Sequence, residues 1–166
     1  MSYFEDLAIG ERRELGAFTF TAELIKAFAR QFDPQPFHLD EDAGRNSVFG
    51  GLAASGWHVT AVYMKLMVAD LQRRAAERAA RGETDVPTGP SPGFRELKWL
   101  KPVLAGDTLR YRSELVSKRE SASRPEWGVI FAHVTALNQR DELAFSFMAS
   151  AFVARRIDAT LPGKTT

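Results

Sequence analysis

A long run of helical periodicity, followed only by strand-like periodicity, is the feature that most restricts the fold of this chain. After FGGLAASG at residues 49–56, apolar residues recur every three or four positions, which places them on one face of a helix. They are Val59, Val62, Tyr63, Leu66, Met67 and Leu71. The stripe runs into the charged, alanine-rich sequence QRRAAERAARG, which is typical of a helix end that reaches solvent, with Gly82 as a suitable stop. We therefore expect one long helix with a buried face.

Strand patterns fill the remainder of the chain. Residues 82–93, GETDVPTGPSPG, form a loop by their glycine and proline content. Alternating patterns around Leu97 and from Leu109 to Leu115 precede a turn at residues 121–126, which leads into WGVIFAHVTAL and ELAFSFMASAFVA. A long helix followed by an antiparallel meander predicts the α+β class, with an antiparallel sheet wrapped around a long central helix in a single domain over residues 1–166. The sheet surface left exposed favours a homodimer or an oligomer of dimers.

Composition and charge exclude several classes of protein. With 166 residues, 45% of them apolar, the chain can bury one compact core. Lys and Arg number 22 against 21 Asp and Glu, and no nucleic-acid-binding motif is present, so we expect no nucleic-acid partner. The absence of cysteine excludes disulfides, thiolate nucleophiles and Cys-ligated zinc. The start MSYFEDLAIGERRE lacks the apolar region of a secretory signal, and no run approaches the ~18 apolar residues of a membrane span, so we expect a cytoplasmic protein with no membrane partner.

The segment FDPQPFHLD lies between two expected helical segments. A helix is predicted over residues 21–31, with Thr21 as its N-cap, and Asp40 is predicted to cap a short helical turn. Between them, Pro34 and Pro36 favour an irregular or extended loop.

This segment carries a carboxylate and an imidazole on a backbone that prolines stiffen. Asp33 and His38 can converge on one water molecule, an arrangement that suits general acid–base chemistry. The alternative is that Asp33 is a turn residue and His38 a solvated or packed loop residue. From the spacing alone, this alternative is the stronger one.

The glycine-rich segment FGGLAASG opens the long helix. The first N–H groups of a helix lack partners and carry a partial positive charge, so they can bind a thioester carbonyl whose oxygen gains charge as an enolate forms. The alternative is helix–sheet packing that demands small residues, and for this segment taken alone it is the better explanation. The order GxxxxGK[ST] of a phosphate loop is absent, which argues against a nucleotide site.

Together, these segments resemble a known family. FDPQPFHLDEDAGRNSVFGGLAASG resembles the signature of the MaoC-like, R-specific enoyl-CoA hydratases, which reads D-x-N-P-x-H-x-D, an Ala-containing turn, a Phe and then a glycine at the start of the central helix. LKWLKPVLAGDTL likewise resembles a strand of this family with its Pro-Val and its Gly-Asp turn. The likeness runs from about residue 19 to residue 153 and implies the hot-dog fold, a sheet wrapped around a long helix.

The resemblance also implies roles for individual residues. Asp33 and His38 would be the catalytic pair, and the backbone N–H of Gly56 would polarise the thioester carbonyl. Further candidates for contact with the substrate are Ser55, Trp57 and Phe49. With Trp99, the last two are candidates to line an acyl tunnel, although aromatic residues at such positions are more often part of the core.

Three positions depart from the family pattern. Gln35 stands where the family usually has Asn, Ser55 where many members have His, and Met64 where some members place a hydroxyl residue. These departures bear on substrate range and rate more than on the Asp33–His38 pair itself.

The implied activity is that of a hydratase/dehydratase. It interconverts a trans-2-enoyl thioester and an (R)-3-hydroxyacyl thioester, carried by CoA or acyl carrier protein, and needs no cofactor beyond that substrate. Which member of the pair is the base stays open, because coupled groups share protons. Two alternatives also stay open: a hot-dog acyl-CoA thioesterase, and a non-catalytic subunit that binds acyl thioesters.

The other histidines and the arginine run are expected to be structural. His58 lies in the first turn of the long helix, where backbone amides disfavour its protonation, so a packing role is preferred. His133 shares a strand pattern with apolar residues and is expected in the core or at an interface. The histidine spacings do not match a helical metal-ligand motif, so no metal is expected. RRAAERAAR is most simply a solvated helix face, with a site for CoA phosphates as the less favoured alternative.

Overall fold

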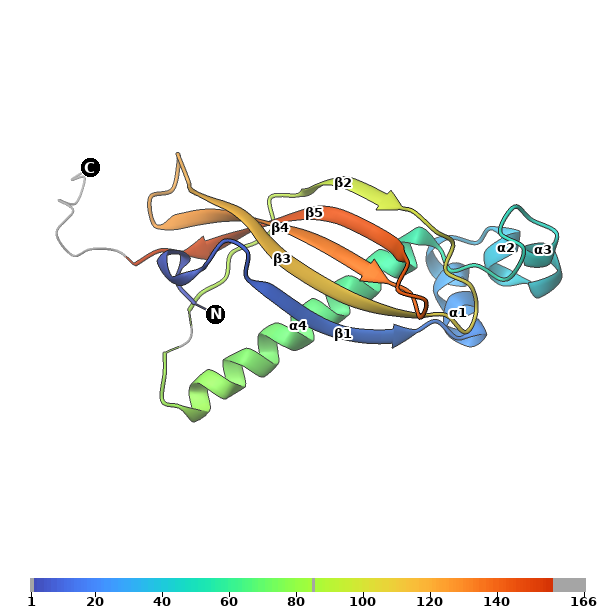
Figure 1. Ribbon diagram of the computed structural model, residues 1–166, viewed down its shortest axis with the longest axis horizontal. Coiled ribbons are helices and arrows are strands. Elements are labelled where there is room, and N and C mark those ends of the chain that lie inside the picture. Colours follow the sequence, from blue (N-terminus) through green and yellow to red (C-terminus); the bar gives the residue numbers. More distant parts are fainter. Residues whose placement is uncertain (1, 85, 157–166) are drawn as a thin grey trace.

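The computed structural model describes residues 2–84 and 86–156 and contains a long helix against a curved sheet (Figure 1). The elements in chain order are a 3-10 turn η1 (Phe4–Asp6), β1 (Arg12–Thr19), α1 (Ala22–Phe32), α2 (Pro36–Leu39), α3 (Glu41–Arg45), α4 (Gly56–Ala80), β2 (Phe94–Trp99), β3 (Thr108–Glu120), β4 (Trp127–Leu137) and β5 (Leu143–Ala154). No helix in the described part of the chain is long and apolar enough to cross a membrane.

The strands form a five-stranded sheet in the order β1-β3-β4-β5-β2, and every neighbouring pair is antiparallel. The strands β1 and β2 are therefore the edges. Irregularities of register interrupt the ladder, for example between Glu14 and Gly16 in β1 and between Leu115 and Ser117 in β3. Such bulges bend strands and increase their twist, which helps the sheet to curve over α4.

The main core lies between the sheet and the N-terminal half of α4. Val59, Val62 and Tyr63 of the helix pack with Tyr111 of β3 and Phe145 of β5, and all are buried. The Tyr111 hydroxyl donates a hydrogen bond of 2.9 Å to the carbonyl oxygen of Val59. The fold prediction is confirmed, because an antiparallel sheet wraps a long central helix as in the hot-dog fold.

The local predictions in the first half were partly correct. The expected helix over residues 21–31 is α1, and the Thr21 side chain accepts a hydrogen bond from the Leu24 N–H at 3.3 Å. Asp40 caps α3 by accepting from the Ala43 N–H at 2.8 Å. The prediction that FDPQPFHLD, residues 32–40, is an irregular or extended loop was wrong, because Phe32 ends α1 and residues 36–39 form α2. Pro36 opens α2, at a helix position where a missing N–H costs nothing and the fixed φ of proline is favourable.

Two further differences concern strands. The strand β1 was not predicted, and it pairs with β3 over most of its length. His133 on β4 is exposed in the chain, so its placement in the core was wrong. A position at an interface stays a prediction.

Candidate active site

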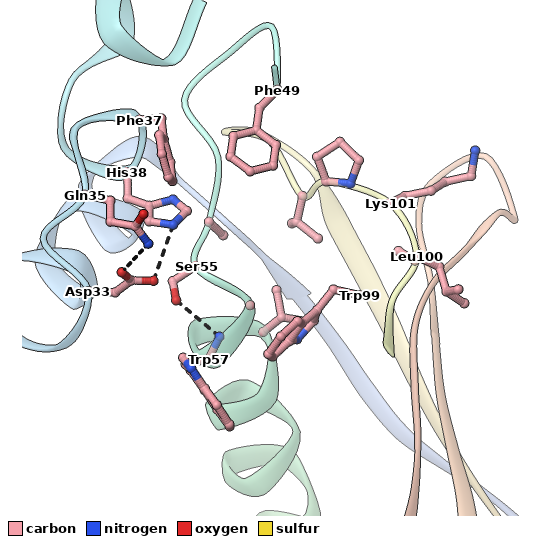
Figure 2. Close-up of a pocket in the computed structure, with 16 residues that line it drawn as sticks. Asp33, Gln35, Phe37, His38, Phe49, Ser55, Trp57, Trp99, Leu100 and Lys101 are labelled. Carbon is pink, nitrogen blue, oxygen red and sulfur yellow. Dashed lines mark hydrogen bonds and ion pairs between the residues drawn. The ribbon is translucent and has the colours of Figure 1, made fainter. Parts of the chain in front are cut away.

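The predicted pair lies where α1 ends and α2 begins. Asp33 is the C-cap residue of α1, and its N–H donates to the carbonyl oxygen of Ala29 at 3.0 Å. His38 lies on the single turn of α2, and its side chain is only 6% exposed. The His38 Nε2 and Asp33 Oδ2 atoms are 3.4 Å apart (Figure 2). The short turn therefore brings the imidazole back toward the carboxylate.

A backbone contact fixes the tautomer of His38. Its Nδ1 is 2.7 Å from the carbonyl oxygen of Ala53. Because a carbonyl oxygen only accepts, Nδ1 carries the hydrogen, and in a neutral ring Nε2 then presents a lone pair. That lone pair faces the Asp33 carboxylate, which is also an acceptor. Such a pair is matched to a donor of two hydrogens, and a water molecule is one.

The surroundings of Asp33 favour its ionised form. Burial raises the pKa of the Asp33 carboxyl, but hydrogen bonding from the Ser55 and Gln35 side chains opposes it, and the pKa lies below its usual value. The contact between Gln35 Nε2 and Asp33 Oδ1 measures 2.8 Å. Gln35 therefore supplies an amide donor to the carboxylate, although it stands where the family usually has Asn.

The N-terminus of α4 faces the same cavity. Ser55 is the N-cap, and its hydroxyl accepts from the Trp57 N–H at 3.2 Å. The N–H of Gly56, the first helical residue, has no acceptor among the described residues. A side chain at Gly56 would overlap the indole of Trp99, so the close packing of these two elements requires glycine. The helix start thus offers a free donor to an oxygen in the cavity.

A cavity of about 460 Å³ contains all of these groups. Every residue proposed from the sequence lines it: Asp33, His38, Phe49, Ser55, Gly56 and Trp57 (Figure 2). Sequence reasoning did not identify residues 100–103 as part of the wall, and they come from the turn after β2. The resemblance of LKWLKPVLAGDTL to a family strand was the one signal that could have identified them. No local sequence pattern links this turn to the segment of Asp33 and His38, which lies much earlier in the chain.

Two other residues lie outside this cavity. Met64 lines a separate, apolar cavity further along α4. His58 lies on the core side of the first turn of α4, stacked on Phe28 with 4.6 Å between ring centroids. Burial lowers the pKa of His58 to about 4, which agrees with the expected packing role and a neutral ring. No group of three or more His, Cys, Asp or Glu residues that could hold a metal ion occurs within residues 2–84 and 86–156.

Comparison with known proteins agrees with the fold. Residues 6–135 match the model of the MaoC like domain. A MaoC-like dehydratase from Rhodospirillum rubrum is 38% identical, with a TM-score of 0.78 over 95% of this chain and 100% of that one. The uncharacterized protein YdeM of Bacillus subtilis is 26% identical over 91% of this chain and 98% of its own length. Mesaconyl-CoA hydratase of Cereibacter sphaeroides is 36% identical over 64 residues, which are 39% of this chain and 18% of that protein. The chain belongs to the MaoC-like family.

Proposed function

We propose that the protein is a hydratase/dehydratase that interconverts a trans-2-enoyl thioester and an (R)-3-hydroxyacyl thioester of CoA. The observation that carries this proposal is the pair of acceptors, His38 Nε2 and Asp33 Oδ2, in the same cavity as the free N–H of Gly56. Family membership supports it, as do the names of two relatives, a dehydratase and an acyl-CoA hydratase. The reaction needs water and the thioester and no further cofactor.

The chemistry follows from the two sides of the cavity. A water molecule donates its hydrogens to Asp33 and His38 and directs an oxygen lone pair at the β-carbon of the enoyl group. As the carbon–oxygen bond forms, the pair takes a proton from the water, and negative charge moves to the thioester oxygen. The N–H of Gly56 and the positive end of α4 stabilise that charge. A proton from the pair then reaches the α-carbon, which completes the addition of water.

The direct test is the loss of enoyl absorbance with crotonyl-CoA. Asp33→Asn and His38→Ala should each lower kcat by a factor on the order of 10² or more, because each removes one acceptor for the water. His133→Ala, at an exposed position on β4, is the matched control and should keep the wild-type rate. Wild-type turnover in either variant of the pair contradicts the proposal.

The same assay separates the alternatives. Release of free CoA thiol without loss of the enoyl group would indicate a thioesterase, in which Asp33 directs water at the carbonyl carbon. Tight binding of acyl-CoA with no turnover would indicate a non-catalytic binding subunit.

We also propose that a second copy of the chain covers the β2 edge of the sheet. Phe94 on this edge is 56% exposed, and Trp99 at the end of the same strand is 45% exposed. Contiguous apolar side chains at an unpaired strand are unfavourable in water and favour self-association. Light scattering should therefore report a dimer, and Phe94→Glu should give a monomer. Ile9→Glu, which changes an exposed apolar residue near η1, should leave the dimer intact.

A further inference from the structure

A second cavity, of about 530 Å³, lies further along α4 than the candidate active site. Its walls are mostly apolar and come from Tyr63, Met64 and Met67 of the helix, Phe94 of β2 and Phe147 of β5. None of the residues that line it lines the cavity of Asp33 and His38. The proposed function assigns no role to this space.

Two tryptophans are in contact between α4 and β2, two elements that each contribute residues to both cavities. Trp57 extends from the first turn of α4 and Trp99 from the end of β2, and their rings form an edge-to-face pair with 5.4 Å between centroids. Both line the candidate active site. One helical turn after Trp57, Thr60 already lines the second cavity, as does Phe94 at the other end of β2. The indole pair therefore connects α4 to β2 next to the point on the helix where the lining changes from the first cavity to the second.

The position of Trp99 is fixed by close packing. Its indole occupies the space that a side chain at Gly56 would need. Gly56 is also the residue whose N–H is available to the thioester carbonyl. An acyl group held there has its α- and β-carbons beside Asp33 and His38, and its later carbons must either stay in the first cavity or pass the indoles.

We propose that the Trp57–Trp99 contact separates the reaction cavity from the apolar cavity and thereby limits the enzyme to short acyl chains. This inference rests on the proposed hydratase function and names its substrate class. Burial of one further methylene group of the acyl chain raises the binding affinity about fourfold. An acyl chain that cannot enter the apolar cavity does not gain this affinity for the carbons beyond the indoles. Removal of an indole should join the two cavities, so that these carbons become buried and the affinity for long acyl chains rises.

The experiment compares crotonyl-CoA with trans-2-decenoyl-CoA. The wild-type protein should show a lower kcat/KM for the longer substrate. Trp99→Ala should raise the decenoyl-to-crotonyl ratio of kcat/KM by about tenfold or more, since several methylenes become buried. Trp57→Ala, which removes a half-exposed side chain from the helix surface, should raise the same ratio and provides a second variant if Trp99→Ala folds poorly. Val116→Ala, at an exposed position on β3 that lines neither cavity, should leave the ratio within about twofold of wild type.

A second readout uses binding rather than turnover. In calorimetry, decanoyl-CoA should bind the wild-type protein no more tightly than butyryl-CoA, and should gain about tenfold or more in Trp99→Ala. Met67→Trp in the Trp99→Ala background fills the apolar cavity and should cancel that gain. Thermal unfolding and light scattering of each variant verify that fold and oligomeric state are unchanged.

The outcomes separate this inference from the proposed function. Hydration of crotonyl-CoA with equal chain-length ratios in the wild type and both tryptophan variants overturns the role of the indoles and leaves the hydratase assignment intact. Equal wild-type rates with the short and the long substrate overturn it as well. No hydration of any enoyl-CoA, together with the predicted shift in binding, removes the hydratase assignment and supports the separation of the two cavities.

Discussion

His58 lies in a cage of phenylalanine rings at the start of α4, and its burial makes a quantitative prediction about acid stability. Its ring stacks on Phe28 and meets Phe20 edge-on with 5.0 Å between centroids. Its Nδ1 is buried and has no hydrogen-bond partner among the described residues. Because burial disfavours the charged form, the pKa of His58 falls from 6.5 to about 4.

The sign of the effect follows from which state binds the proton. Between pH 6.5 and about 4, the unfolded chain protonates His58 and the folded protein keeps it neutral. The stability that His58 contributes is fully present above the unfolded pKa and is lost as the pH falls toward the folded one. At about pH 4.5, this difference in pKa lowers the free energy of unfolding by about 2–3 kcal/mol relative to neutral pH.

Urea unfolding of the wild type and of His58→Phe at neutral pH and at about pH 4.5 measures this contribution. Phenylalanine has a similar shape and no titrating nitrogen, so the variant should lose about 2–3 kcal/mol less than the wild type on acidification. His133→Asn, which removes an exposed histidine, should follow the wild type. Parallel losses in the wild type and His58→Phe would refute the reasoning.

Two further substitutions test contacts that hold α4 in place. Tyr111→Phe removes the buried hydrogen bond to the carbonyl oxygen of Val59 and should lower the free energy of unfolding by about 1 kcal/mol, measured by chemical denaturation; an unchanged midpoint would contradict this. Gly56→Ala forces a methyl group against the Trp99 indole and should destabilise the protein by about 1–3 kcal/mol in thermal unfolding. The double variant Gly56→Ala/Trp99→Ala should lose less free energy of unfolding than the sum of the losses in the two single variants. A loss equal to that sum would show that the two residues do not compete for space.

The parts of the fold that could be predicted are those that local signals encode. Helical periodicity predicted α4, and the hydroxyl of Thr21 correctly marked the beginning of α1. The strand β1 gave no such signal. It is an edge strand with a single buried residue, Leu15, so its conformation depends on pairing with β3 rather than on its own pattern.

His133 shows the limit of an argument from alternation. The continuous pairing of β4 with β5 from Trp127 to Ala136 keeps His133 on the same face of the strand as Val129, as alternation indicates. Val129 is buried on that face but His133 is exposed, and the buried residues beside His133 are Val134 and Ala136 of the opposite face. Alternation shows which residues share a face, but not how far along the strand the rest of the chain covers that face.

Backbone contacts, rather than the side chains that depart from the family pattern, set the position of the His38 ring. The Ala53 carbonyl holds the His38 ring, and the Ala53 N–H donates in turn to the carbonyl oxygen of Phe37 at 3.2 Å. The next N–H, of Ala54, donates to the carbonyl oxygen of Val103 at 2.7 Å, which ties this segment to the turn after β2. Backbone groups are present whatever side chains surround them. Changes at residues 35, 55 and 64 can therefore alter the hydrogen bonds of the carboxylate and the shape of the cavities while the imidazole keeps its tautomer and its position.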